Sequence, residues 1–391
     1  MKKSACNRRK FLQLGVAATA AVAGAGTAGA AVEPLRPGVS EEPLMRTLGR
    51  TGIRLPVVSM GVMRADNPNI VKGAYKLGIT LFDTAHGYQD GRNEEMLGDF
   101  FKDKPRDSFV LATKIKPPKG ATADKFLEML DLSLKRLQME QVDILYLHAV
   151  DEQEELHREE LVYAMNTARE QGKVRFLGFS THRNMAKLID AAAERGFYDV
   201  VLTTYNFRLA GDQAMTTALK KAHESGMGIV AMKNMAGGWL DENRTKAVNC
   251  KAALKWAVSS PYVHTCIPGI VSFEMLMENW SVAGDLNLTE KEREDLKLAS
   301  RETGLFCMGC NSCAGQCSYD LPVSELMRSY MYNYAYAYPA KAWQTVKETG
   351  IKEDPCVACK QCTVQCKAGF DIRSRITNIA RIQKVPEEFL V

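Results

Sequence analysis

Eight of the 11 cysteines in this 391-residue chain lie between Cys307 and Cys366. They form two runs with the same spacing, in which two, two and three residues separate successive cysteines. The first run is Cys307, Cys310, Cys313 and Cys317, and the second is Cys356, Cys359, Cys362 and Cys366. Three thiolates two residues apart can wrap one face of a cubic cluster from a tight loop. The spacing therefore favours two [4Fe–4S] clusters.

This spacing resembles that of two-cluster bacterial ferredoxins, in which the fourth cysteine of each run reaches the other cluster. The resemblance implies that Cys366 joins the first run's cluster and Cys317 the second. Three alternatives stay open. The first is zinc, which prefers two well-separated cysteine pairs. The second is disulfides, which suit an exported protein, although cysteines two residues apart form a disulfide with each other poorly. A single cluster is the third, because Ser318 and Lys367 stand where ferredoxins usually have proline.

The first 30 residues are predicted to be an export signal. Arg8-Arg9 followed by Phe11-Leu12 resembles a twin-arginine signal, and an uncharged Ala/Gly-rich run follows to about Val32. A Pro-rich linker is expected over 31–44. We therefore expect export by the twin-arginine machinery to a periplasmic or other extracytoplasmic location, with an uncleaved membrane anchor as the alternative. That route carries folded proteins, so clusters can be inserted before export.

The charge of the chain gives no support for nucleic-acid binding. The net charge is +5, from 51 basic and 46 acidic residues, and residues 1–30 hold five basic and no acidic residues. Without the signal the chain is neutral, so we expect no nucleic-acid partner.

Residues 45–298 are predicted to form an α/β domain, a (β/α)8 TIM barrel, followed by a smaller ferredoxin-type iron–sulfur domain over 299–391. Eight short β-branched runs alternate with longer amphipathic stretches such as 122–138. The expected strands are 57–61, 78–83, 108–114, 143–148, 174–180, 199–206, 228–233 and 263–269. In such barrels the functional residues lie at the strand C-termini.

Four such positions carry groups suited to moving a proton to or from a carbonyl oxygen. Asp83, Lys114 and His148 end three successive strands, and Tyr88 follows Asp83 by five residues. A free tyrosine has a pKa of about 10, and we expect the neighbouring ammonium of Lys114 to lower it. Tyr88 would then be the general acid/base, Asp83 would orient Lys114, and His148 would hydrogen-bond the substrate oxygen.

The segment from Met45 to about Asn279 resembles the aldo-keto reductases. The opening RTLGRTGIRLPVVSMG, the four residues above, GKVRFLGFS, Tyr205-Asn206, AGG at 236–238 and IPG…EN at 267–279 carry the resemblance. The whole chain resembles bacterial aldo-keto reductases with a ferredoxin-type C-terminal domain. The resemblance implies an oxidoreductase that interconverts a small-molecule carbonyl and alcohol with NAD(P)H.

The expected nicotinamide pocket departs from the family pattern. Leu202 replaces a glutamine, and Met232 replaces the tyrosine that stacks on the nicotinamide. Gly269 and Met275 stand where members that prefer NADP place a lysine and an arginine. The residues carried over as cofactor-binding are Ser180, Thr181, Met232, Lys233, Gly237, Gly269 and Asn279. Three hypotheses follow: NAD(H) replaces NADP(H), side chains such as Lys233 compensate, or the barrel binds no nicotinamide.

The third hypothesis leads to a different class of function. The protein would be an electron-transfer or partner-binding iron–sulfur protein with a redox partner, and the barrel would be a scaffold. The segment between the cysteine runs has tyrosines at every second position from Tyr330 to Tyr338. Its period favours a strand and its composition a helix. An aromatic layer packed on the clusters or the barrel is the simpler interpretation, and a docking surface the other. His182 is a further candidate for lining the barrel mouth.

Overall fold

The computed structural model describes residues 42–390, so the predicted export signal and most of the predicted linker lie outside the described residues. The described part opens with an antiparallel hairpin, β1 (Met45–Thr47) and β2 (Arg54–Pro56). No helix in this part is both long and apolar enough to span a bilayer.

The eight predicted barrel strands are confirmed as one parallel sheet in chain order, with each strand paired to the next. Backbone bridges from Val58 to Cys266 and from Gly61 to Gly269 join the first strand to the last and close the barrel. The strands are β3 (Met60–Gly61), β4 (Leu81–Asp83), β5 (Val110–Ile115), β6 (Val142–Leu147), β7 (Val174–Thr181), β8 (Val200–Thr204), β9 (Gly228–Met232) and β10 (Thr265–Cys266).

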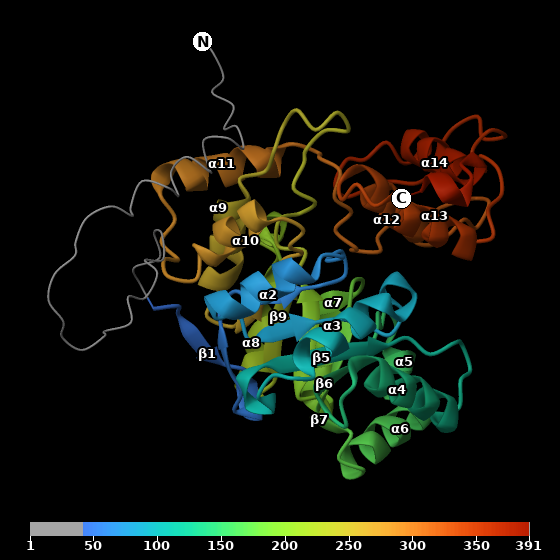
Figure 1. Cartoon of the computed structure of the whole chain (residues 1–391). Helices are drawn as coiled ribbons and strands as arrows, with labels where there is room; N and C mark the ends of the chain where they lie inside the picture. The colour runs from blue at the N-terminus through green and yellow to red at the C-terminus, as the bar shows by residue number, and fades with distance from the viewer. Residues whose placement is uncertain (1–41, 391) are drawn as a thin grey trace, which may run out of the picture. The chain divides into compact units, whose positions relative to one another are not determined.

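Helices follow the strands and surround them (Figure 1). The predicted helix at 122–138 is α4 (Ala123–Leu137), whose first turn is capped by the Thr122 side chain, which accepts a hydrogen bond from Lys125 N. The other barrel helices are α2 (Pro68–Leu77), α3 (Arg92–Phe101), α5 (Gln153–His157), α6 (Glu159–Glu170), α7 (Met185–Arg195), α8 (Gln213–Glu224), α9 (Cys250–Ser259) and α10 (Phe273–Trp280).

The predicted domain boundary at 298 falls inside helix α11 (Glu290–Arg301), and the division into two domains stays a prediction. A capping box formed by Thr289 and Glu292 fixes the start of α11. Beyond it, α12 (Val323–Tyr334), α13 (Pro339–Glu348) and α14 (Ile372–Ala380) lie together in Figure 1. The tyrosine-rich segment is therefore a helix as far as Tyr334, and not a strand.

Two apolar clusters among the described residues bear on the site. One fills the barrel and includes Leu55, Tyr146, Leu202 and Met232. The other joins α12, α13 and α14 to Phe207, Ala236 and the start of α9, so the C-terminal helices share their core with the outer part of the barrel. Tyr330 and Tyr332 belong to this second cluster, which confirms the aromatic layer.

Candidate active site

Asp83 and Lys114 form a buried ion pair at the ends of β4 and β5. Lys114 Nζ lies 2.5 Å from Asp83 Oδ1, and both side chains are at most 3% exposed. Lys114 also donates to the carbonyl oxygen of Thr84. Burial raises the pKa of Asp83 and lowers that of Lys114, while the attraction between the two charges opposes both shifts. The remaining oxygen, Asp83 Oδ2, is buried and has no hydrogen-bond partner within residues 42–390.

Tyr88 and His148 complete the predicted group. Lys114 Nζ lies 4.8 Å from the centre of the Tyr88 ring. The rings of Tyr88 and His148 meet edge to face, with centroids 5.9 Å apart. Burial, followed by the positive charges of Lys114 and Lys116, lowers the pKa of His148 well below its usual value, so the imidazole is neutral. The structure thus brings all four predicted residues together at one end of the barrel.

The predicted lowering of the Tyr88 pKa is wrong. Burial raises it well above the usual value, and the negative charges of Asp83, Tyr332 and Tyr338 raise it further. Lys114 does not reverse this, because its ammonium is paired with Asp83 at the bottom of the site. The phenol therefore carries its proton at neutral pH, which is the form that a proton donor must have.

The Asp83–Lys114 pair also makes a prediction for stability. Replacing Asp83 by Asn leaves a buried ammonium without its counter-charge, which costs about 3–5 kcal/mol. We expect Asp83→Asn to lower the unfolding temperature, measured by circular dichroism on protein with unchanged iron content. The double variant Asp83→Asn/Lys114→Met should recover part of the loss, and Asp99→Asn, in an exposed pair with Lys102, should match the parent. A parent-like Asp83→Asn variant would contradict the assigned role.

Two predicted cofactor residues are engaged within the barrel. Ser180 Oγ accepts a hydrogen bond of 2.8 Å from Ala149 N, directly after His148. Thr181 Oγ1 donates to the carbonyl oxygen of Arg183 at 2.9 Å. Both side chains are buried at the end of β7. Here they shape the loops beside His148.

The residues after β9 are in contact with the C-terminal helices. A Cβ atom on Gly237 would lie 2.6 Å from Cβ of Ala335, so the open side of this glycine is covered by the chain itself. Lys233 has a left-handed backbone, with φ +57°, and its Nζ lies 5.4 Å from the centre of the Tyr332 ring. Met232 packs inside the barrel. The Cβ side of Gly237 therefore faces Ala335, and its role as a cofactor contact stays a prediction.

Two other predicted cofactor residues have either unpaired polar atoms or open space beside them. Asn279 in α10 is 1% exposed, and neither its Oδ1 nor its Nδ2 has a partner among the described residues. An unpaired buried amide is costly, which points to a ligand here. Gly269 is exposed, and nothing lies within 4 Å of where its Cβ would be.

Sequence reasoning missed the residues that α12 and α13 bring to this face. Arg328, Tyr332 and Lys341 influence the pKa values of residues in the predicted active site. Arg64 near β3 donates to the carbonyl oxygen of Tyr336 at 2.6 Å. The alternating tyrosines were the available signal, but periodicity alone does not tell which surface a segment covers.

In space, the cysteines form two groups, and each group contains one cysteine from the other run. Burial raises the pKa of Cys307 to about 11, and the neighbouring thiols of Cys313, Cys310 and Cys366 add to the rise. Burial likewise raises the pKa of Cys356 to about 11, with smaller contributions from Asp354, Cys359, Cys362 and Cys317. Each fourth cysteine is thus a neighbour of the other run.

Hydrogen bonds between the runs hold this crossed arrangement. Gln316, next to Cys317, accepts from Thr363 Oγ1 through its carbonyl oxygen and from Gln365 N through Oε1, both at 2.7 Å. None of the ten cysteines that the structure describes is in a disulfide. The first run turns through left-handed residues at Gly309, Asn311 and Gly315.

Within residues 42–390, no group of three or more His, Cys, Asp or Glu side chains is placed to hold one ion. A zinc ion with Zn–S bonds of about 2.3 Å needs its sulfurs roughly 3.8 Å apart. A four-iron cluster binds each thiolate at a different iron, so its ligands stand farther apart.

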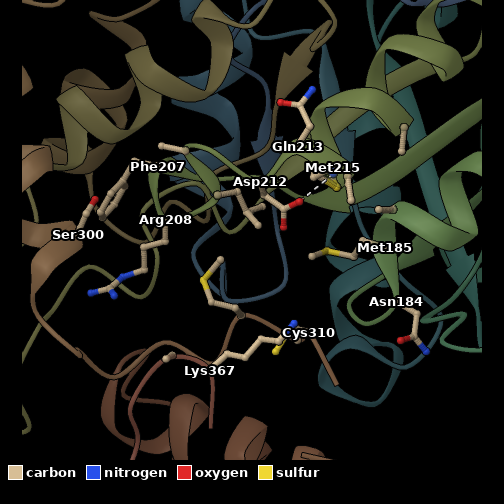
Figure 2. Close-up of a pocket in the computed structure, with 18 of the residues that line it drawn as sticks. Asn184, Met185, Phe207, Arg208, Asp212, Gln213, Met215, Ser300, Cys310 and Lys367 are labelled. Atoms are coloured by element: carbon tan, nitrogen blue, oxygen red, sulfur yellow. Dashed lines mark hydrogen bonds between the residues drawn. The ribbon is translucent and has the colours of Figure 1, made fainter. Parts of the chain in front are cut away.

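A groove of about 1200 Å³ lies between helices α7 and α8 of the barrel and part of the first cysteine run. Figure 2 shows Cys310 and Lys367 on one side of it and Asn184, Met185, Asp212 and Met215 on the other. Cys310 is the exposed cysteine of its set. On the barrel side of the same run, a Cβ on Gly309 would lie 2.0 Å from the carbonyl oxygen of His182, so the run packs directly on the loop after β7.

Comparisons with known proteins agree with this architecture. Residues 58–252, about half of the chain, match the model described as "Aldo/keto reductase family". L-Galactose dehydrogenase of Arabidopsis thaliana is 25% identical over 294 residues, which cover 64% of this chain and 92% of that protein. L-Glyceraldehyde 3-phosphate reductase of Escherichia coli K12 is 33% identical over 157 residues, covering 35% of this chain and 45% of that protein.

Among solved structures, the aldo-keto reductase AKR11C1 from Bacillus halodurans, in its holo form, superposes with a TM-score of 0.56. It is 21% identical, and the match covers 67% of this chain and 97% of that one. This similarity concerns the fold, and the matched family model supports the same assignment. Through its barrel, the chain belongs to the aldo/keto reductase family and is an oxidoreductase.

Proposed function

We propose that this protein is an exported iron–sulfur oxidoreductase that interconverts a carbonyl and an alcohol on a small molecule, with Tyr88 as general acid/base. The observation that carries the proposal is the arrangement around the Tyr88 phenol. Lys114 is held below the ring by Asp83, and His148 meets the ring at its edge.

Each residue then has a defined task. The protonated Tyr88 phenol donates its proton to the carbonyl oxygen as negative charge develops there, and takes it back from an alcohol in the reverse direction. Neutral His148 hydrogen-bonds the same oxygen and orients it. Lys114 offers positive charge near the phenolate that Tyr88 becomes after donation, which stabilises that state. A bound nicotinamide would supply or accept the hydride.

The cysteine sets fit two [4Fe–4S] clusters. Cys307, Cys310, Cys313 and Cys366 would hold one, and Cys317, Cys356, Cys359 and Cys362 the other. The support is the crossed neighbourhood of the thiols and the Gln316 hydrogen bonds that fix it. Clusters of this type exchange one electron at a time, and the exposed position of Cys310 beside the groove suits exchange with a redox partner.

The residues predicted to bind a nicotinamide are suited to that cofactor only in part. Asn279 offers an unpaired buried amide and Gly269 open space, whereas Gly237 is covered by Ala335. Export adds a constraint, since a nucleotide outside the cytoplasm would have to be loaded beforehand and recycled in place. The close approach of Ala335 to Gly237 favours a second candidate function. In it, the protein is an electron-transfer or partner-binding protein whose barrel binds no nicotinamide.

Nucleotide content separates the two functions. We would purify the cluster-loaded protein without oxygen, denature it and identify released nucleotides by mass spectrometry, with NAD(H) and NADP(H) titrations of the native protein alongside. We expect a stoichiometric or tightly titrating nucleotide. Absence of binding for both would leave Tyr88 without a hydride source and favour electron transfer.

A further inference from the structure

The groove beside Cys310 is lined by parts of the chain that belong to one cysteine set. Cys310 and Lys367 lie on one side of it, and helices α7 and α8 form the other (Figure 2). Lys367 directly follows Cys366, which the proposed crossed arrangement assigns to the same cluster as Cys310. No cysteine of the second set is among the lining residues. The groove therefore gives access to the first set through its exposed cysteine.

Three cations of this groove have no partner within residues 42–390. Lys187 on α7, Arg301 at the end of α11 and Lys367 are all exposed. None of them makes a salt bridge or a side-chain hydrogen bond in the described part of the chain. The fourth basic residue, Arg208, differs from them, because it donates to three backbone carbonyl oxygens in and after α11. We call Lys187, Arg301 and Lys367 the groove cations.

The carboxylates of the groove do not neutralise these cations. Asp190 and Glu302 each pair with a lysine outside the lining, at 2.7 and 3.0 Å. Asp212 accepts the backbone hydrogen bond that caps α8, at 2.9 Å. Its single charge is balanced by that of Arg208. The groove cations are therefore a local positive charge on a chain that is neutral without its predicted export signal.

The size of the groove indicates what kind of partner it takes. Its volume of about 1200 Å³ exceeds the roughly 300–1000 Å³ of most small-molecule pockets. The groove cations come from three separate parts of the chain, so one small anion would not meet all three. Positive charge spread over such a surface attracts a protein with an acidic face, speeds its association and fixes its orientation.

We propose that this groove is the docking surface for an acidic one-electron carrier protein that exchanges electrons with the first cluster. The inference rests on the proposed function, which assigns Cys310 and Cys366 to one [4Fe–4S] cluster. One electron passes between the carrier and this cluster, so that one of them is oxidised by one electron as the other is reduced. No bond is made or broken. Carboxylates of the carrier meet the groove cations.

Charge reversal tests the docking surface. The groove variant reverses all three groove cations, Lys187→Glu/Arg301→Glu/Lys367→Glu. The matched control reverses one exposed arginine and two exposed lysines that do not line the groove, Arg54→Glu/Lys72→Glu/Lys76→Glu. Both variants change the net charge by the same amount, so a difference between them reports on the groove alone. Neither alters a cysteine, and both should bind as much iron as the parent.

Binding can be measured without turnover. We would titrate the anaerobic, cluster-loaded protein with an oxidised acidic flavodoxin in a calorimeter. We expect the groove variant to raise the Kd about tenfold or more at low ionic strength, and the difference to shrink as salt is added. Reduction of the protein by the flavodoxin hydroquinone, followed by stopped-flow visible absorbance, should slow in parallel. The control variant should match the parent in both measurements.

Three results would overturn the proposal. The first is an equal effect of the groove and control variants, because net charge would then govern association. The second is a parent that does not bind the flavodoxin at low ionic strength. The third uses ferricyanide, a small anionic oxidant. If the groove variant slows oxidation by ferricyanide and leaves flavodoxin binding unchanged, the groove serves a small anion and not a protein. If the groove variant loses iron, Lys187→Glu decides alone, since it lies on barrel helix α7 and should still raise the Kd about threefold.

Failure of this inference is distinguishable from failure of the proposed function. The titrations test docking, whereas turnover of Tyr88→Phe tests the acid in the barrel. Groove-dependent docking with full turnover in Tyr88→Phe would overturn the proposed catalysis alone. Lost turnover in Tyr88→Phe without groove-dependent docking would overturn the docking surface alone.

Discussion

The Tyr88→Phe variant is expected to lose about 10²–10⁴-fold in kcat/KM for carbonyl reduction, the usual contribution of a general acid. Phenylalanine keeps the ring that meets His148 edge to face and removes only the proton-donating hydroxyl. The measurement is steady-state reduction of a probe such as 4-nitrobenzaldehyde by whichever nucleotide the protein binds, under anaerobic conditions.

Two controls make the Tyr88 result specific. Iron content and the visible absorbance of the variant should equal those of the parent, because Tyr88 lies outside both cysteine sets. Tyr163→Phe alters an exposed tyrosine, 65% accessible, on barrel helix α6, and should leave kcat/KM unchanged. Parent-like turnover of Tyr88→Phe would remove Tyr88 from the mechanism and with it the assignment of the four residues.

Single replacements of Cys310 or Cys366 are each expected to lower bound iron from about eight to about four atoms per chain, because a [4Fe–4S] cluster that lacks one of its four thiolates is poorly held. The crossed arrangement adds a sharper expectation. The double variant Cys310→Ala/Cys366→Ala should still keep about four irons, since both residues would serve one cluster. The double variant Cys366→Ala/Cys359→Ala should keep almost none.

Uncrossed clusters predict the opposite pattern for these pairs, with Cys366 and Cys359 on the same cluster. Iron and acid-labile sulfide assays on anaerobically reconstituted protein decide between the patterns. The buried free thiol Cys266 is the control, and Cys266→Ala should keep the parent's iron because Cys266 lies in barrel strand β10, paired with Ala231 of β9. Parent-like iron and absorbance in all the single variants would overturn the cluster assignment.

The chemistry of the barrel and that of the cysteine sets meet at α12. The first cysteine run packs on His182 at the end of β7, and the helix between the runs carries Tyr332 to Lys233. The cysteine variants should therefore be assayed for turnover as well as for iron.

Much of this arrangement follows from the sequence alone. The eight strands were predicted because each buried strand is a short β-branched run, and parallel strands bring their C-terminal ends to one face. Asp83, Lys114 and His148 end such strands and do lie together with Tyr88. The cysteine spacing is likewise local information, because a loop around a cluster is built from residues close in the chain.

Only the tertiary structure decided how the two parts of the chain modify each other. The rise in the Tyr88 pKa comes first from burial of the phenol, which no spacing near Tyr88 encodes. The loss of open space at Gly237 depends on Ala335, and the identity of the tyrosine segment as a helix depends on its packing in the second core. Such contacts join residues far apart in the chain and have no periodic signature, since side-chain patterns report which face of an element is buried and not what covers it.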